Sequence, residues 1–253
     1  MTTFKTFGHL GDMFCLTSAA HTYARLTKLP TYIDDSSWGH EIAAMYDDGL
    51  LKIGSDGDEF DMHGVMALHR SPEGVMPNYL GCYQYHILKD VPKLLGTTME
   101  KFGKLIDGFE PPPQGPNSGR YLIQPYSRNA PNPPERALQE IVDGFHLWMP
   151  DKPLYAIGRT DTPRALKGVD YSMLEDSAAA FVKNVAEAKM VFTPHSAAAH
   201  IAAAYNTQAF VWCPDWDENW QLSYPGWDAE FITFHDKASD LILPPNNGRI
   251  ASA

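Results

Sequence analysis

The sequence has few cysteines and no long apolar run. Its three cysteines, Cys15, Cys82 and Cys213, lie far apart and form no CxxC pair. This pattern disfavours a disulfide framework or a cysteine-based zinc site and is typical of a reducing compartment. No stretch of about 18 uncharged apolar residues is present, and the N-terminus lacks an apolar leader. We therefore expect a cytoplasmic protein with no membrane span and no signal peptide.

Basic residues are also scarce. The chain has 20 Lys and Arg against 31 Asp and Glu, which gives a formal net charge of −11 at pH 7, and neither half of the sequence is basic. A protein that holds several phosphates of a nucleic acid needs a basic face. Nucleic acid is therefore a poor partner, and so is an extended anionic membrane surface. A small anion held by a few arginines and backbone N–H groups remains open.

The sequence alternates between strand-like and helix-like segments, which predicts an α/β fold with parallel sheets. We expect strands at 3–7, 30–33, 50–54, 121–124, 154–157, 190–193 and 209–213, and helices at 12–28, 35–48, 85–95, 97–106, 134–148, 176–189 and 196–205. Residues 55–85 are rich in turn formers, and the acidic stretch at 56–61 has the character of a solvated turn rather than a calcium-binding loop.

A proline-rich segment at 111–119 interrupts this alternation and excludes both helix and central strand. The same pattern then restarts. We predict two Rossmann-like domains facing a central cleft, the first at 1–110 and the second at 120–253, with a linker at 111–119. In such sheets ligands bind at the carboxyl ends of the strands.

The first candidate site follows the first expected strand, in the stretch Gly8-His9-Leu10-Gly11-Asp12. Its glycine spacing does not match the GxGxxG dinucleotide fingerprint. One interpretation is a strand-to-helix turn in which Asp12 is the N-cap. The other places Asp12 at the cleft, where its carboxylate takes a proton from an incoming hydroxyl.

The second candidate site is Thr193-Pro194-His195-Ser196-Ala197, where a strand ends and an alanine-rich helix begins. The N–H groups of such a helix bind anions, and alanines let a diphosphate approach. His195 could bind a phosphate or sugar hydroxyl, and His200 could bridge the helix to the cleft; packing alone is the alternative for both. Ser127 and Arg128 end another strand, where a guanidinium can hold phosphate, although a solvated loop arginine is the alternative. We interpret 158–161, with Arg159, as a plain surface turn.

In chain order these pieces resemble the heptosyltransferase family of GT-B glycosyltransferases. The opening Gly8–Asp12 stretch, the Gln124-Pro125-Tyr126-Ser127-Arg128 strand end and the helix after His195 each resemble a signature of that family. The resemblance covers 4–30 and 120–220. The sequence departs from the pattern at His195, where the family has an acidic residue, at Ala197, where it has glycine, and beyond Arg128, where the family's lysine is absent.

The resemblance implies an inverting glycosyltransferase that moves a sugar from a nucleotide-diphosphate sugar to an acceptor hydroxyl, with Asp12 as general base. It implies no metal and no cofactor beyond the nucleotide sugar, and leaves open whether the acceptor is a glycan, a lipid-linked sugar or a small molecule. By the resemblance, the domain at 1–110 would be the acceptor side and the domain at 120–253 would bind the nucleotide sugar. The donor site would comprise Ser127, Arg128, His195, Ser196, Ala197 and His200, and the acceptor-side loop Gly8, His9 and Gly11. A catalytically inactive binding module and a nucleotide-sugar epimerase remain as alternatives.

Overall fold

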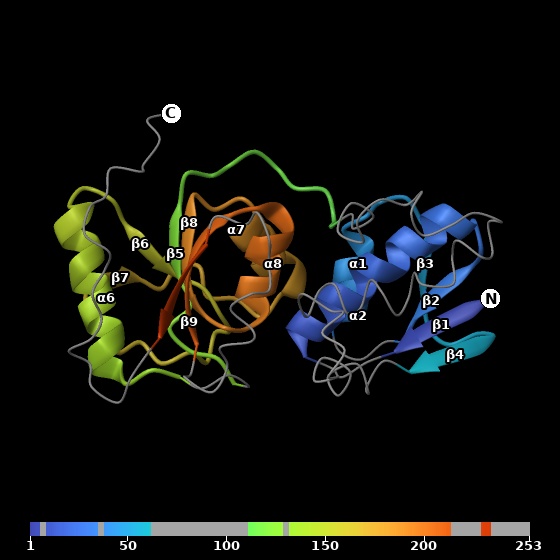
Figure 1. Cartoon of the computed structure of the whole chain (residues 1–253), viewed down its shortest axis with the longest axis horizontal. Helices are drawn as coiled ribbons and strands as arrows, with labels where there is room; N and C mark the ends of the chain where they lie inside the picture. The colour runs from blue at the N-terminus through green and yellow to red at the C-terminus, as the bar shows by residue number, and fades with distance from the viewer. Residues whose placement is uncertain (6–8, 35–37, 62–110, 129–131, 214–228, 234–253) are drawn as a thin grey trace.

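The computed structural model describes residues 1–5, 9–34, 38–61, 111–128, 132–213 and 229–233, which form two parallel sheets and their helices (Figure 1). The predicted α/β class is therefore confirmed. The smaller sheet has the order β3-β2-β1-β4 and the larger has the order β10-β9-β8-β5-β6-β7. The predicted helices at 85–95 and 97–106 lie outside the described residues.

The elements of the smaller sheet come from the first 61 residues. Its strands are β1 (Thr2–Lys5), β2 (Thr31–Ile33), β3 (Leu51–Ile53) and β4 (Asp58–Asp61), and its helices are α1 (Leu10–Thr27) and α2 (Gly39–Ala44). The elements of the larger sheet begin after the proline-rich segment. They are β5 (Tyr121–Ile123), α6 (Glu135–Trp148), β6 (Leu154–Ala156), β7 (Val169–Asp170), α7 (Ala178–Ala186), β8 (Met190–Pro194), α8 (Ala197–Tyr205), β9 (Gln208–Cys213) and β10 (Ala229–Thr233).

The acidic stretch at 56–61 is not the solvated turn that we predicted. Residues 58–61 form β4, which pairs in parallel with β1 from Thr2↔Asp58 to Lys5↔Asp61. The Thr3 hydroxyl donates to the Asp56 carbonyl at 2.8 Å, and the Lys5 ammonium lies 2.7 Å from a Glu59 carboxylate oxygen. Backbone pairing and this ion pair therefore stabilise a charged edge strand, which sequence propensity disfavours.

Most of the helices form a layer between the two sheets (Figure 1). Helices α1 and α2 lie on the smaller sheet, α7 and α8 lie on the facing side of the larger sheet, and α6 covers the outer side of the larger sheet. Alternating strand residues divide between two cores, as the pleat requires. Leu122, Val191 and Val211 join the central core, whereas Ile123 and Phe192 pack with α6.

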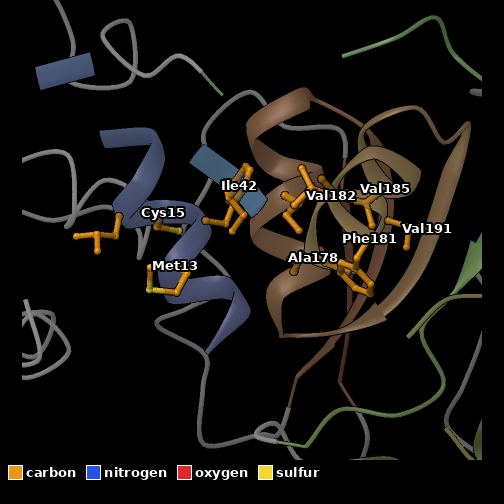
Figure 2. Packing of buried hydrophobic residues seen from close by; sticks show 14 of the residues in the cluster. Met13, Cys15, Ile42, Ala178, Phe181, Val182, Val185 and Val191 are labelled. Atoms are coloured by element: carbon orange, nitrogen blue, oxygen red, sulfur yellow. The ribbon is translucent and has the colours of Figure 1, made fainter. Parts of the chain in front are cut away.

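The central core contains residues of both sheet units. Figure 2 shows Met13 and Cys15 of α1 and Ile42 of α2 on one side and Phe181 and Val182 of α7 on the other, all members of one buried cluster. Because α1 is covered on both sides, every residue from 12 to 24 is buried. The two units are thus joined by a shared apolar core.

A carboxylate of the first unit also caps a helix of the second. Glu41 of α2 accepts hydrogen bonds from the Ser177 hydroxyl at 2.7 Å and from the Ala179 backbone N–H at 3.2 Å, at the start of α7. Ser177 is itself the N-cap of α7, and its hydroxyl accepts from the Ala180 N–H. A carboxylate at a helix N-terminus satisfies orphan donors and interacts favourably with the helix dipole. This contact fixes α2 against α7.

The proline-rich segment contains neither helix nor strand, as predicted. It lies against the larger unit: the Tyr205 hydroxyl donates to the Pro112 carbonyl at 2.6 Å, and the Ser118 N–H donates to the Glu187 carbonyl at 2.6 Å. Burial raises the pKa of Tyr205, so its hydroxyl remains a donor across the physiological range. None of the helices within the described ranges is both long and apolar enough to cross a membrane.

A histidine–aspartate pair anchors α1 beside the end of α2. The buried His21 ring places Nε2 at 2.6 Å from an Asp48 carboxylate oxygen and stacks on Tyr46 at 3.8 Å between ring centroids. Burial raises the pKa of Asp48, but hydrogen bonds from His21 and from the Leu50 N–H outweigh it and hold the pKa below its usual value. The charged form of Asp48 therefore stabilises the fold.

Replacing Asp48 with asparagine is expected to lower the free energy of unfolding by about 0.5–1 kcal/mol near neutral pH, a small effect because Asp48 is partly exposed. A carboxyl whose pKa is depressed by folding stabilises above its unfolded pKa, and this stabilisation is lost as the pH falls through the folded value. Urea titrations at about pH 5 and about pH 3 should show that the difference between the two proteins shrinks in acid. A difference that grows in acid would contradict the assignment.

Candidate active site

The turn from β8 into α8 is organised by a glutamine that follows β5. The Gln124 side-chain oxygen accepts from the Ser196 hydroxyl at 2.8 Å and from the Thr193 hydroxyl at 3.1 Å. The His195 N–H donates to the Trp212 carbonyl at 3.0 Å. These bonds connect the carboxyl ends of β8, β5 and β9, which lie side by side in the sheet.

Ser196 is the N-cap residue of α8, but its hydroxyl bonds to Gln124 and does not cap the helix. A helix that begins in this way presents the N–H groups of its first turn and the positive end of its dipole at the sheet edge. The predicted start of the helix is confirmed. The side chain of Ser196 holds the turn in place, and the backbone of Ala197 and Ala198 is the part suited to an anion.

The two histidines of this segment lie close together. The ring centroids of His195 and His200 are 5.3 Å apart with an interplanar angle of 78°, an edge-to-face arrangement. His200 is 6% exposed and His195 is partly exposed. The structure therefore brings both predicted histidines to the first turns of α8.

The N-terminus of α1 packs directly against these turns. A Cβ built at Gly11 would lie 3.2 Å from His200 Cδ2 and 3.3 Å from Ala197 Cα. Such contacts are tighter than side chains normally make, so Gly11 and Ala197 are small because the two helices approach closely here. Three predicted site residues from opposite ends of the sequence thus meet at one point.

Asp12 lies in the first turn of α1, adjacent to this contact, and is 8% exposed. The interpretation of Asp12 as an N-cap is wrong: the N-cap is the exposed residue His9, and Asp12 is the third helical residue. A carboxylate there is favourably placed relative to the helix dipole. Gly8 lies outside the described residues.

Ser127 and Arg128 follow β5, as predicted. Ser127 is buried, its N–H donates to the Asn132 side-chain oxygen at 2.7 Å, and the Asn132 amide donates back to the Ser127 carbonyl at 2.7 Å. Arg128 is exposed and forms an ion pair with Asp161 in the loop after β6. The Asn132 clamp fixes the backbone from which the arginine extends.

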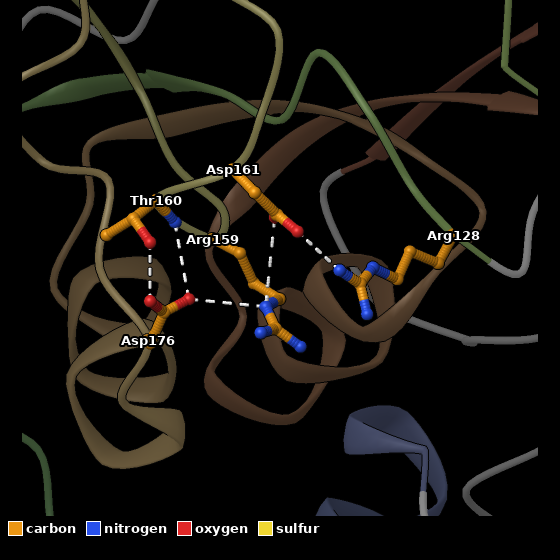
Figure 3. A network of polar contacts seen from close by, with 5 residues as sticks. All are labelled: Arg128, Arg159, Thr160, Asp161 and Asp176. Carbon is orange, nitrogen blue, oxygen red and sulfur yellow. Dashed lines mark hydrogen bonds and ion pairs between the residues drawn. The ribbon is translucent and has the colours of Figure 1, made fainter.

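The segment at 158–161 is a largely exposed turn, as predicted, but its side chains belong to a wider network of ion pairs. Arg159 pairs with Asp176 at 3.2 Å and lies 3.8 Å from Asp161, so two arginines and two aspartates form one network (Figure 3). The Thr160 hydroxyl donates to Asp176 and lowers the pKa of that carboxyl. Sequence propensity indicated a turn correctly but could not show which distant carboxylates its arginine would meet.

All these segments lie at the same edge of the larger sheet. Strands β8, β5 and β6 are neighbours and pair in parallel, so their carboxyl ends are adjacent. With about 4.8 Å between neighbouring strands, the start of α8 and the loop after β6 lie on the order of 10 Å apart at the level of the sheet. This distance suits a diphosphate with its attached groups.

Two further features bear on ligands. Across the described ranges, no group of three or more His, Cys, Asp or Glu side chains has the geometry to hold a metal ion. A cavity of about 280 Å³ lies at the opposite edge of the larger sheet, bordered by Gln114, Lys189, Tyr205 and Gln208. It is formed at the amino ends of strands and is separate from the candidate site.

No protein-family model matches the sequence, and no curated protein matches it. Solved structures do match. The E. coli heptosyltransferase WaaC with ADP has a TM-score of 0.62 and 11% identity, covering 95% of this chain and 96% of that one. The E. coli ADP-heptose lipopolysaccharide heptosyltransferase II has a TM-score of 0.55 and 11% identity, covering 96% of this chain and 94% of that one. This chain has the heptosyltransferase fold.

A third match is the iron-containing dodecameric glycosyltransferase TibC of enterotoxigenic E. coli H10407, with a TM-score of 0.56 and 11% identity, covering 94% of this chain and 65% of that one. The heptosyltransferase fold thus occurs here at low sequence identity over nearly the whole chain. The resemblance inferred from short motifs is confirmed at the level of the fold.

Proposed function

We propose that the protein is a glycosyltransferase that moves a sugar from a nucleotide-diphosphate sugar to an acceptor hydroxyl with inversion at the anomeric carbon. The observation that carries this proposal is the contact between the N-termini of α1 and α8, where Gly11 meets Ala197 and His200. It brings a carboxylate-bearing helix turn from one unit to an anion-binding helix turn of the other. The structural relatives WaaC with ADP and WaaC with ADP-2-deoxy-2-fluoro heptose support a nucleotide sugar as donor.

In the proposed reaction Asp12 is the general base. Its carboxylate takes the proton of the acceptor hydroxyl while that oxygen attacks the anomeric carbon. The bond between the anomeric carbon and the phosphate oxygen breaks, and the nucleoside diphosphate leaves with the electron pair. A single displacement of this kind inverts the configuration.

The charge that develops on the leaving diphosphate is stabilised by groups already in place. The N–H groups of the first turn of α8 and the guanidinium of Arg128 face the same sheet edge, and His195 and His200 supply further polar contacts. Donors prepositioned where charge develops are usually the largest contribution to catalysis. We propose that this arrangement needs no metal and no cofactor besides the nucleotide sugar.

A thermal-shift screen against ADP-, GDP-, UDP-, CDP- and dTDP-sugars, with and without magnesium, tests the proposal. At 100 times its dissociation constant a donor stabilises the native state by about 2.7 kcal/mol, which is a readily measured shift in Tm. We expect one nucleotide series to stabilise the protein equally in both conditions. Stabilisation that requires magnesium would refute the metal-independent form, and no shift from any nucleotide would refute the transferase.

A second readout separates the enzyme from a binding module of the same fold. The sugar nucleotide that gives the shift is incubated with the protein, and release of the nucleoside diphosphate is followed with and without candidate glycan acceptors. A transferase releases the diphosphate when its acceptor is present. Binding without release for every acceptor class would favour a module that binds the nucleotide sugar alone.

A further inference from the structure

The arginine–aspartate network contains a carboxylate that is bound as a phosphate would be. Asp161 places Oδ2 against Arg128 Nη2 and Oδ1 at 3.8 Å from Arg159 Nε, so its two oxygens face two different guanidiniums (Figure 3). The two arginines come from different strand ends, β5 and β6. Asp161 therefore lies between the two guanidiniums, paired with Arg128 and close to Arg159.

The two arginines differ in how firmly they are anchored. Arg159 also pairs with Asp176 at 3.2 Å, and Asp176 accepts from the Thr160 N–H at 3.3 Å and from the Thr160 hydroxyl. These contacts fix the loop independently of Asp161. Arg128, by contrast, pairs with Asp161.

The pair between Arg128 and Asp161 is easily exchanged. The side chains are 53% and 58% exposed, and ion pairs this exposed contribute little to stability. A phosphate accepts bidentate hydrogen bonds from a guanidinium and carries more charge than a carboxylate. A diphosphate that arrives at this edge can therefore replace the carboxylate at small cost.

We propose that Asp161 is an internal competitor for the donor diphosphate: it occupies Arg128 and Arg159 in the unliganded protein, and the diphosphate displaces it. The proposal rests on the proposed function in that it takes the diphosphate of the donor as the natural ligand. It adds Asp161 as the residue that sets donor affinity and Arg159 as a second cation. The exchange makes and breaks only ion pairs and hydrogen bonds.

Binding of inorganic pyrophosphate, measured by isothermal titration calorimetry at low ionic strength, tests this proposal. Asp161→Asn is expected to bind pyrophosphate about three- to fivefold more tightly than the wild type. A fivefold change in Kd corresponds to about 1 kcal/mol, the upper value for an exposed ion pair that no longer competes. Asp143→Asn is the matched control, because it changes the net charge equally on α6, where its partner is Gln139 and not an arginine of the network. It is expected to bind no more tightly than the wild type.

Several outcomes overturn the proposal. Equal tightening in both variants would show a general charge effect, and weaker binding in Asp161→Asn would make Asp161 a support for the arginines rather than a competitor. If neither the wild type nor Asp161→Asn bound pyrophosphate, the two arginines would not form a diphosphate site. An Arg128→Gln variant is expected to abolish the difference between the Asp161 forms.

The same titrations keep this proposal separate from the proposed function. Pyrophosphate carries no base and no sugar, so tightening in Asp161→Asn supports the exchange even if no nucleotide sugar stabilises the protein. In that case the transferase is refuted and the anion site stands. Conversely, stabilisation by a nucleotide sugar together with unchanged pyrophosphate binding in Asp161→Asn supports the transferase and overturns the role of Asp161.

Discussion

Replacing Asp12 with asparagine is expected to lower the rate of sugar transfer by about 10²–10⁴-fold, the range that a positioned general base contributes. Asparagine has nearly the same shape and retains a hydrogen-bond acceptor, but it does not take a proton from the acceptor hydroxyl. Because Asp12 lies in the first turn of α1 rather than at the turn of α8, nucleotide-sugar binding should change little. The measurement is kcat for transfer together with the Kd of the donor for each protein.

The control for this experiment is Asp143→Asn. Asp143 is an exposed aspartate on α6 that accepts a hydrogen bond from Gln139, on the outer side of the larger sheet. Its replacement removes the same charge and is expected to leave kcat unchanged. If Asp12→Asn retains the wild-type kcat while donor binding is intact, Asp12 is not the base. If the variant loses donor binding as well, Asp12 acts in binding rather than in proton transfer.

Much of the fold was predictable because its elements follow simple periodic patterns. Apolar residues at helical spacing predicted α1, α6 and α8 to within a few residues, and the buried strands β5 and β8 were expected at nearly their observed positions. Strands β7 and β10 were not predicted, and β4 was expected to be a turn because its acidic sequence has low strand propensity. Pairing with β1 decides its conformation, and such tertiary context is absent from a local pattern.

The candidate site was predictable where it depends on strand ends. Because parallel strands end at one edge, the sequence placed Arg128 and His195 on the same side of a sheet, and the structure has them there. Gln124 was missed as a site residue, although a polar amide directly after a buried strand is a signal. Its role depends on the hydroxyls of Thr193 and Ser196, which lie about 70 residues away in sequence.

The ion-pair network and the shared core were beyond the reach of sequence for the same reason. Asp161 and Asp176 follow no motif, and their importance arises from meeting Arg128 and Arg159 in space. Likewise, an all-buried α1 is explained only when two units cover it from both sides. Apolar residues around a whole helix predict burial, but they do not identify what buries the helix.

Replacing Ile42 with alanine is expected to lower the free energy of unfolding by about 2–5 kcal/mol, since Ile42 is fully buried in the core that the two units share. Ile141→Ala is the matched control, because Ile141 is equally buried but lies in the core between α6 and the outer side of the larger sheet. Urea titrations should show comparable losses of stability for the two variants.

Hydrogen exchange distinguishes the two variants. Ile42 packs where α2 meets α1 and α7, so its loss should speed amide exchange in helices of both units, whereas Ile141→Ala should act on α6 and the neighbouring strands. The proposed transfer requires the N-termini of α1 and α8 to stay in contact. Measured at a temperature well below the Tm of each variant, kcat should therefore fall in Ile42→Ala but not in Ile141→Ala. If faster exchange in Ile42→Ala were confined to α1 and α2, the shared core would not hold the two halves of the site together. The position of Asp12 relative to α8 would then have to come from contacts other than this cluster.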